Sequence, residues 1–288
     1  MHSSQIQKLE CALYVVATPI GNMRDISLRA LDILASADTI AAEDTRNSAH
    51  LLTHHGITAK RLLALHQHNE RGAAEKVIVL LAQGQSVALI TDAGTPAVSD
   101  PGALVVEAVR AAGYRVIPIP GANAAVAALS AAGLAAPHFL FYGFLPNKSA
   151  ARCKELHTLI AHPYTLVFYE APHRILESVA DLQTVFGGER EIVLAREVTK
   201  LFESIHRCRL DEAMDWLNSD PNNLRGEFVL LVSAAPARAE GISAEAEHVL
   251  GVLLHELPLK QAVQLAVKIT GTAKNELYQR ALALQAID

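Results

Sequence analysis

The sequence of 288 residues has few cysteines, few aromatic side chains and no excess of positive charge. Its three cysteines, Cys11, Cys153 and Cys208, lie far apart and form no CxxC pair. This excludes a disulfide scaffold and a cysteine-based zinc site, and it is typical of a reducing cytoplasm. The sequence has 25 Lys and Arg residues and 30 Asp and Glu residues, so its formal net charge is −5. A nucleic-acid partner would therefore have to be held by local basic patches.

Several motifs of common enzyme classes are also absent. The sequence has no GxGxxG fingerprint, no P-loop, no GxSxG nucleophile and no HExxH pair. We expect no metal, although histidines cluster between His50 and His68, and we place His66 and His68 on one face of a strand. These absences argue against a hydrolase and favour a transferase that uses an activated small-molecule donor.

No segment predicts export or membrane insertion. The start, MHSSQIQKLE, lacks the basic-then-apolar pattern of a signal peptide. Residues 116–147 carry no Asp, Glu, Lys or Arg, but Pro118, Pro120 and Gly121 would break a spanning helix early. We expect a strand, a turn, an alanine-rich helix and a further strand there, in a cytoplasmic protein without a membrane partner.

The first part of the chain alternates short apolar runs with amphipathic helical segments. We expect strands at 12–18, 38–44, 61–69, 86–92 and 114–120, and helices at 25–37, 46–56, 73–84 and 101–113. Continuous apolar strands that alternate with helices predict a mainly parallel sheet covered on both faces. We assign this pattern to an N-terminal α/β domain over 11–120.

The rest of the chain predicts a second, mixed α/β domain over 121–235 and a helical module over 243–288. Expected strands lie at 165–170, 190–197, 201–208 and 226–234, and the short gap between the middle two predicts an antiparallel hairpin. After a linker over 234–243 we expect two helices, 259–269 and 273–284, joined by a glycine turn. This module has a local excess of positive charge. A helical pair that packs against the rest of the protein and a module that contacts nucleic acid explain it equally well.

Ligands of parallel sheets bind beyond the carboxyl ends of the strands. Three loops at such ends, 17–22, 91–96 and 120–125, are rich in small residues that let the backbone approach a flat ligand. We expect Asp92 to contact this ligand. By contrast, Asp100 precedes a proline in the pattern of a helix cap, so we assign it a structural role.

Charged residues follow other strands as well. Asp44 either caps the next helix or forms a polar cluster at the rim of the crevice, with Arg46 available for a phosphate. The segments 169–174 and 196–200 also end strands, and a solvated loop or interdomain ion pair explains them about as well as a functional site.

Motifs in order along the chain resemble the ribosomal RNA small subunit methyltransferase I family, a branch of the tetrapyrrole methylases. The resemblance rests on ATPIGN, AEDTR, DAGTPAVSDPG, IPIPGANAA, YEAPHR and GEFVLLV, and it extends from about Leu13 to the tail. It implies two α/β domains of the tetrapyrrole-methylase type, with S-adenosylmethionine in the cleft between them, in a homodimer. It also implies 2′-O-methylation of the ribose of a cytidine near the decoding site, in small-subunit ribosomal RNA or the assembled small subunit.

The resemblance further implies which residues form the site. The residues expected to bind the donor are Pro19, Gly21, Asp92, Ala93, Gly94, Thr95, Pro96, Ala124, Ala125 and Tyr169. A ribose hydroxyl is a poor nucleophile, so a carboxylate that takes its proton should help, and our candidates are Asp44 and Glu170, with Asp25 as a third. The residues expected to contact RNA, assisted by the tail, are Arg46, Arg174, Lys200, Lys268 and Lys274.

Two alternatives stay open. A methyltransferase of the same fold could act on a tetrapyrrole or another small acceptor, which would call for a broad apolar crevice. A binding module without catalysis is less favoured, because the crevice loops keep polar residues such as Asp44, Asp92 and Glu170.

Overall fold

The computed structural model describes residues 9–134, 137–236, 242 and 244–285. It consists of two compact units, Met1–Ala235 and Pro236–Asp288, each with apolar cores of its own. Most of the linker predicted at 234–243 lies outside the described residues, as do both ends of the chain. None of the helices described is long and apolar enough to cross a membrane.

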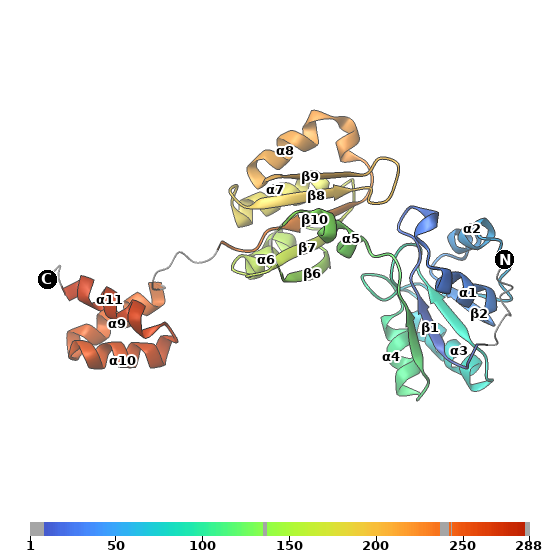
Figure 1. Cartoon of the computed structure of the whole chain (residues 1–288), viewed down its shortest axis with the longest axis horizontal. Helices are drawn as coiled ribbons and strands as arrows, with labels where there is room; N and C mark the ends of the chain where they lie inside the picture. Colours follow the sequence, from blue (N-terminus) through green and yellow to red (C-terminus); the bar gives the residue numbers. More distant parts are fainter. Residues whose placement is uncertain (1–8, 135–136, 237–241, 243, 286–288) are drawn as a thin grey trace. The chain divides into compact units, whose positions relative to one another are not determined.

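The first unit begins with a parallel five-stranded sheet in the order β3-β2-β4-β1-β5 (Figure 1). Its strands are β1 (Leu13–Val16), β2 (Thr39–Ala42), β3 (Leu62–Ala64), β4 (Val87–Ile90) and β5 (Val116–Ile119). The helices between them are α1 (Leu28–Ser36), α2 (Thr45–His54), α3 (Glu70–Ala82) and α4 (Ala103–Ala111). Helices α1 and α2 bury apolar side chains against one face of the sheet, and α3 and α4 against the other. The parallel sheet covered on both faces is therefore confirmed.

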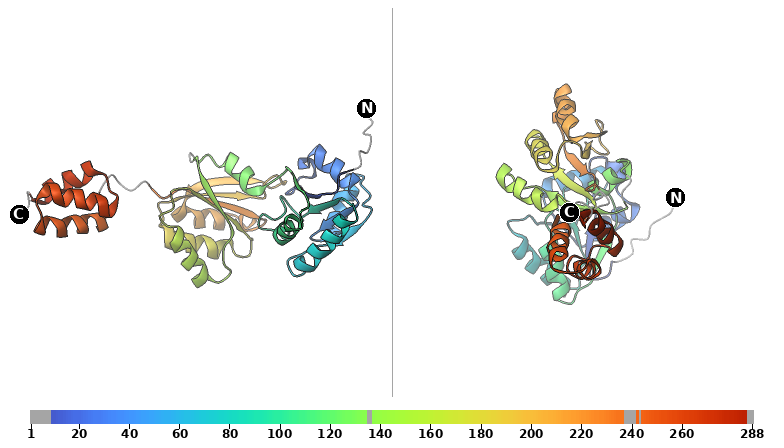
Figure 2. Two further views of the ribbon diagram at one scale, coloured as in Figure 1. Left: turned by 90° about the horizontal axis from the view of Figure 1, so that it is seen from below. Right: turned by 90° about the vertical axis from the view of Figure 1, so that its left-hand side faces the viewer.

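A second sheet in the same unit has the order β6-β7-β10-β8-β9, in which only β6 and β7 pair in parallel. Its strands are β6 (Phe139–Phe144), β7 (Thr165–Glu170), β8 (Glu191–Arg196), β9 (Ser204–Arg209) and β10 (Phe228–Val232). The helices are α5 (Ala124–Ala131), α6 (Ser149–Leu159), α7 (Ile175–Phe186) and α8 (Leu210–Ser219). The alanine-rich α5 covers one face alone, and α6, α7 and α8 cover the other (Figure 2). The mixed sheet and the β8–β9 hairpin match the expectation from sequence.

The second unit is a bundle of three helices, α9 (Ala244–Glu256), α10 (Leu259–Thr270) and α11 (Lys274–Gln285). Only two helices are predicted there, so that prediction is wrong in number. The missed helix α9 buries Ala246 and Leu250, four residues apart on one face, against side chains of α10 and α11. Gly251 lies within this helix and weakens the helical pattern in the sequence, and the segment before the helix also contains a glycine.

Two local predictions are also wrong. Strand β3 ends at Ala64, so His66 and His68 lie in the following turn and not on one face of a strand. The side chain of Asn69 closes this turn, because its Oδ1 accepts a hydrogen bond from the backbone N–H of His66 at 2.9 Å. The cap of α4 is Gly102 rather than Asp100.

Candidate active site

A cavity of about 300 Å³ opens where loops of the two sheets meet within the first unit. From the first sheet and the start of α5 it is lined by Ile20 and by segments 93–95, 98–100 and 123–124. From the second sheet it is lined by Phe144, Val198, Lys200 and segments 169–172 and 227–229. Several of these segments follow the carboxyl ends of strands β1, β4 and β5, which is where a parallel sheet binds its ligands.

Hydrogen bonds join the three small-residue loops to one another. Thr18 and Gly94 exchange backbone hydrogen bonds, with N···O distances of 2.8 and 3.1 Å. The hydroxyl of Thr95 donates to the carbonyl of Ala122 at 3.2 Å. Gly94 has a φ of 85°, a conformation that side chains rarely tolerate, so the turn at this wall of the cavity favours glycine.

The structure brings part of the predicted donor set into the cavity wall. The donor-set residues that line it are Ala93, Gly94, Thr95, Ala124 and Tyr169. Glu170, a predicted proton acceptor, and Lys200, a predicted RNA contact, line it as well. Pro19, Gly21, Pro96 and Ala125 lie beside lining residues but do not line the cavity themselves. The backbone N–H of Ala125 donates to the hydroxyl of Tyr169 at 3.3 Å, which ties the start of α5 to strand β7.

Asp92 joins two loops and does not line the cavity. Its carboxylate accepts hydrogen bonds from the backbone N–H of Asp44 at 3.2 Å and from the side chain of Asn47 at 2.9 Å. Beneath it, the hydroxyl of Thr91 donates to Glu43 Oε2 at 2.6 Å. Asp92 therefore holds the loop after β4 against the start of α2.

Asp44, a predicted proton acceptor, caps α2 and lies outside the cavity lining. Its carboxylate accepts a hydrogen bond from the backbone N–H of Arg46 at 2.8 Å and pairs with the Arg46 guanidinium at 3.2 Å. The hydrogen bond from the Arg46 side chain lowers the pKa of Asp44 below its ordinary value. The side chain of Arg46 is 90% exposed, so it is accessible to a phosphate.

Glu170, the other predicted proton acceptor, lines the cavity but is only 2% exposed, and its carboxylate is occupied. It accepts hydrogen bonds from the hydroxyl of Ser178 at 2.5 Å and from the backbone N–H of Ala171 at 2.8 Å. It also forms an ion pair with Arg174 at 3.2 Å. This carboxylate therefore anchors the end of β7.

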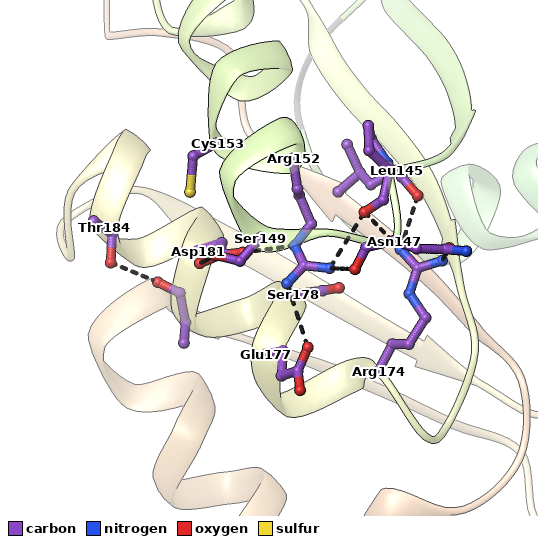
Figure 3. A network of polar contacts seen from close by, with 12 residues as sticks. Leu145, Asn147, Ser149, Arg152, Cys153, Arg174, Glu177, Ser178, Asp181 and Thr184 are labelled. Atoms are coloured by element: carbon purple, nitrogen blue, oxygen red, sulfur yellow. Dashed lines mark hydrogen bonds and ion pairs between the residues drawn. The ribbon is translucent and has the colours of Figure 1, made fainter.

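Two arginines fix the loop that follows β6 (Figure 3). Arg174 donates to the carbonyl of Leu145 at 2.8 Å and to Asn147 Oδ1 at 2.5 Å. The side chain of Arg152 is fully buried and pairs with Asp181 at 2.7 Å; its Nη1 donates to two carbonyls of the same loop at 3.4 Å, and its Nη2 lies 3.7 Å from Glu177. The guanidinium of Arg174, predicted to contact RNA, is thus engaged inside the unit.

Lys200, also predicted to contact RNA, bridges two carboxylates at the cavity. Its ammonium lies 2.8 Å from Glu197 Oε1 and 2.8 Å from Glu227 Oε2. Burial disfavours the charged form, but the hydrogen bonds to both carboxylates outweigh it and raise the pKa of Lys200. This arrangement favours glycine at position 21, because a Cβ there would lie 2.4 Å from Lys200 Cγ and the lysine side chain would have to shift.

Sequence reasoning missed Asp100 as a lining residue. Helix α4 is capped from elsewhere: Glu70 Oε1 accepts hydrogen bonds from the backbone N–H groups of Gly102 and Leu104, both at 2.8 Å. Burial, followed by the charges of Glu43 and Asp92, raises the pKa of Asp100 to about 7. Only the raised pKa and the tertiary position reveal this carboxyl, because Asp before Pro has the ordinary pattern of a cap.

The expectation that this protein holds no metal comes from the sequence and stays a prediction. Within the described ranges, no group of three or more His, Cys, Asp or Glu side chains is arranged to hold a metal ion. The cavity walls combine small residues and aromatic rings with the charged side chains of Asp100, Glu170, Lys200 and Glu227.

Comparisons with known proteins identify the family. A family described as Tetrapyrrole (Corrin/Porphyrin) Methylases matches residues 12–214, and one described as RsmI C-terminal HTH domain matches 240–285. A ribosomal RNA small subunit methyltransferase I of Pseudomonas aeruginosa is 54% identical over 275 residues, which cover 95% of this chain and 97% of that protein. Its counterpart in Escherichia coli O157:H7 is 50% identical and covers 95% of both.

Solved structures show the same fold at lower identity. A cobalt precorrin-4 methyltransferase of cobalamin biosynthesis matches with a TM-score of 0.57 at 17% identity, over 77% of this chain and 95% of that one. A uroporphyrin-III C-methyltransferase from Thermus thermophilus, in complex with S-adenosylhomocysteine, matches with a TM-score of 0.55 at 16% identity, over 77% and 97%. The resemblance found in the motifs is confirmed, and this chain belongs to the ribosomal RNA small subunit methyltransferase I family within the tetrapyrrole methylases.

Proposed function

We propose that this enzyme methylates the ribose 2′-hydroxyl of a cytidine in small-subunit ribosomal RNA, near the decoding site, with S-adenosylmethionine as donor. The observation that carries the proposal is the 47–54% identity to relatives named for this RNA, over nearly the whole chain. The match includes the tail, which the tetrapyrrole-methylase match over 12–214 leaves out.

The chemistry of the cavity fits this donor. S-adenosylmethionine supplies a methyl group carried on a positively charged sulfur. Ala93, Gly94 and Ala124 leave room for a flat adenine, and the carboxyl of Asp100 suits a neighbouring cation. The work of the protein is then to align the acceptor hydroxyl with the methyl group and to exclude water from the reacting atoms.

Exposed basic residues support the assignment of RNA contact to the tail and to α2. Lys268 on α10 and Lys274 at the start of α11 are exposed, as is Arg46. Arg46 pairs with Asp44, but its side chain is 90% exposed, whereas the ion-paired side chains of Arg174, Lys200 and Arg280 are only 13%, 27% and 42% exposed. We therefore assign phosphate contact to Lys268, Lys274 and Arg46.

We predict that Lys268→Ala combined with Lys274→Ala weakens RNA binding without changing donor affinity. Each lost phosphate contact should reduce the slope of log K against log salt by about 1, so the double variant should lose about 2. Electrophoretic mobility shift at several salt concentrations measures this slope. Lys154→Ala, an exposed lysine on α6, is the matched control, and an equal change in that control would contradict the tail assignment.

Transfer of labelled methyl groups tests the proposed function. We expect tritium from labelled S-adenosylmethionine to enter small subunits or their RNA, at a nucleotide that resists alkaline cleavage because its 2′-oxygen is blocked. Parallel reactions with a tetrapyrrole or with free nucleosides test whether the enzyme methylates a small-molecule acceptor. Transfer to a tetrapyrrole but not to RNA would replace this proposal with the alternative acceptor class.

A cytoplasmic location and a homodimer are further parts of the proposal. The RNA acceptor and three free cysteines support a reducing compartment. The homodimer follows from the family resemblance, and the molar mass from light scattering should be twice 30.9 kDa.

A further inference from the structure

Asp100 lines the cavity, and the helix cap that its sequence pattern predicts is provided by another residue. Glu70, from the first turn of α3, caps α4 in its place. The carboxylates of Glu170, Glu197 and Glu227 have hydrogen-bonded or ion-paired cations, as described above. The carboxyl of Asp100 is thus available at the cavity wall.

Strained backbone fixes the segment that carries Asp100. Ala97 and Ser99 have φ values of 67° and 63°, which are uncommon for residues with side chains and gather at functional sites. Gly143, with a φ of 83° beside an irregularity in β6, leaves room for this segment, because a Cβ there would lie 2.6 Å from Ser99 Oγ. Both sheets therefore determine where the carboxyl lies.

We propose that Asp100 accepts the proton of the acceptor hydroxyl during methyl transfer. This inference rests on the proposed function. The hydroxyl oxygen bonds to the methyl carbon while the carbon–sulfur bond breaks and its electron pair stays on sulfur. The hydroxyl proton passes to the Asp100 carboxylate and then to water, so atoms and charge balance.

The surroundings suit a proton acceptor near neutral pH. The charged and titratable groups around Asp100 are Glu43 after β2, Asp92 after β4 and Tyr169 on β7, with Lys200 and Glu227 elsewhere on the cavity wall. The hydroxyl of Thr91 is the group that would lower the pKa of Asp100, but it donates its single proton to Glu43 at 2.6 Å. An acceptor with a pKa of about 7 matches its task better than an ordinary carboxylate.

Asp100→Asn keeps the size of the side chain and removes the proton acceptor, with Glu107→Gln on the exposed side of α4 as control. We expect kcat at saturating donor and RNA to fall about 100-fold or more, a larger loss than the loss of donor affinity measured by calorimetry. The wild-type kcat/KM for the donor, which reports the free enzyme, should fall about tenfold per pH unit below pH 7, and the variant should lose this dependence.

The pH dependence of thermal stability tests the raised pKa of Asp100 without an activity measurement. Because the folded pKa of Asp100 is raised from 3.8 to about 7, the wild type loses stability as pH rises through this window. The gain in Tm from Asp100→Asn should therefore be larger at pH 8 than at pH 5. Equal Tm shifts at both pH values would overturn the inference, as would a variant that changes donor affinity but leaves kcat and the pH profile of kcat/KM intact. If the wild type itself transfers no methyl group to RNA, the proposed function fails instead, and the inference fails with it.

Discussion

Replacing Ala124 with Trp should abolish binding of S-adenosylmethionine, with a loss of affinity of at least about 100-fold. Ala124 is the first residue of α5 and lines the cavity, so an indole there fills space that the donor needs. A ligand that cannot enter loses its contacts altogether, and 100-fold corresponds to only about 2.7 kcal/mol. Isothermal titration calorimetry measures the effect.

Val126→Trp is the matched control on the same helix. Val126 is 58% exposed and does not line the cavity, so the same indole should leave donor affinity within about twofold. Equal affinity in both variants would show that the donor binds elsewhere. Circular dichroism of both variants checks that α5 stays folded.

Replacing Arg152 with Met should destabilise the first unit by about 3–5 kcal/mol. The guanidinium is fully buried and pairs with Asp181 at 2.7 Å, so its removal leaves a largely buried carboxylate without its cation (Figure 3). Urea denaturation followed by circular dichroism measures the free energy of unfolding.

A second substitution separates lost charge balance from lost packing. Asp181→Leu, added to Arg152→Met, removes the stranded carboxylate and should recover part of the stability, because an apolar pair can replace a buried ion pair. A single variant within 1 kcal/mol of wild type would contradict the prediction. A double variant no more stable than the single one would show that volume, not charge, matters at this site.

The strands and the crevice loops were predictable because their signals are local. Strands β2 and β4 are buried along their whole length, and a continuous apolar run indicates this directly. The loop after β4 supplies lining residues Ala93 to Thr95, since every parallel strand delivers its carboxyl end to the same edge of the sheet.

Some of the wrong and missing predictions depend on partners that are distant in sequence. Asp100 has the pattern of a cap, but Glu70 takes that position from 30 residues earlier. Lys200 pairs with Glu227, which lies 27 residues later in the sequence. Other pairings are local, because Glu170 lies four residues before Arg174 and Glu197 three residues before Lys200, so these carboxylates could have been considered from the sequence.

The placement of the donor is tested most directly by a crystal structure of the full chain soaked with S-adenosylmethionine. We predict electron density for the donor in the cavity, with its ring system against Ala93, Gly94 and Ala124 and its sulfur toward Asp100. Density at another surface, or a cavity that stays empty at donor concentrations that saturate activity, would contradict this placement.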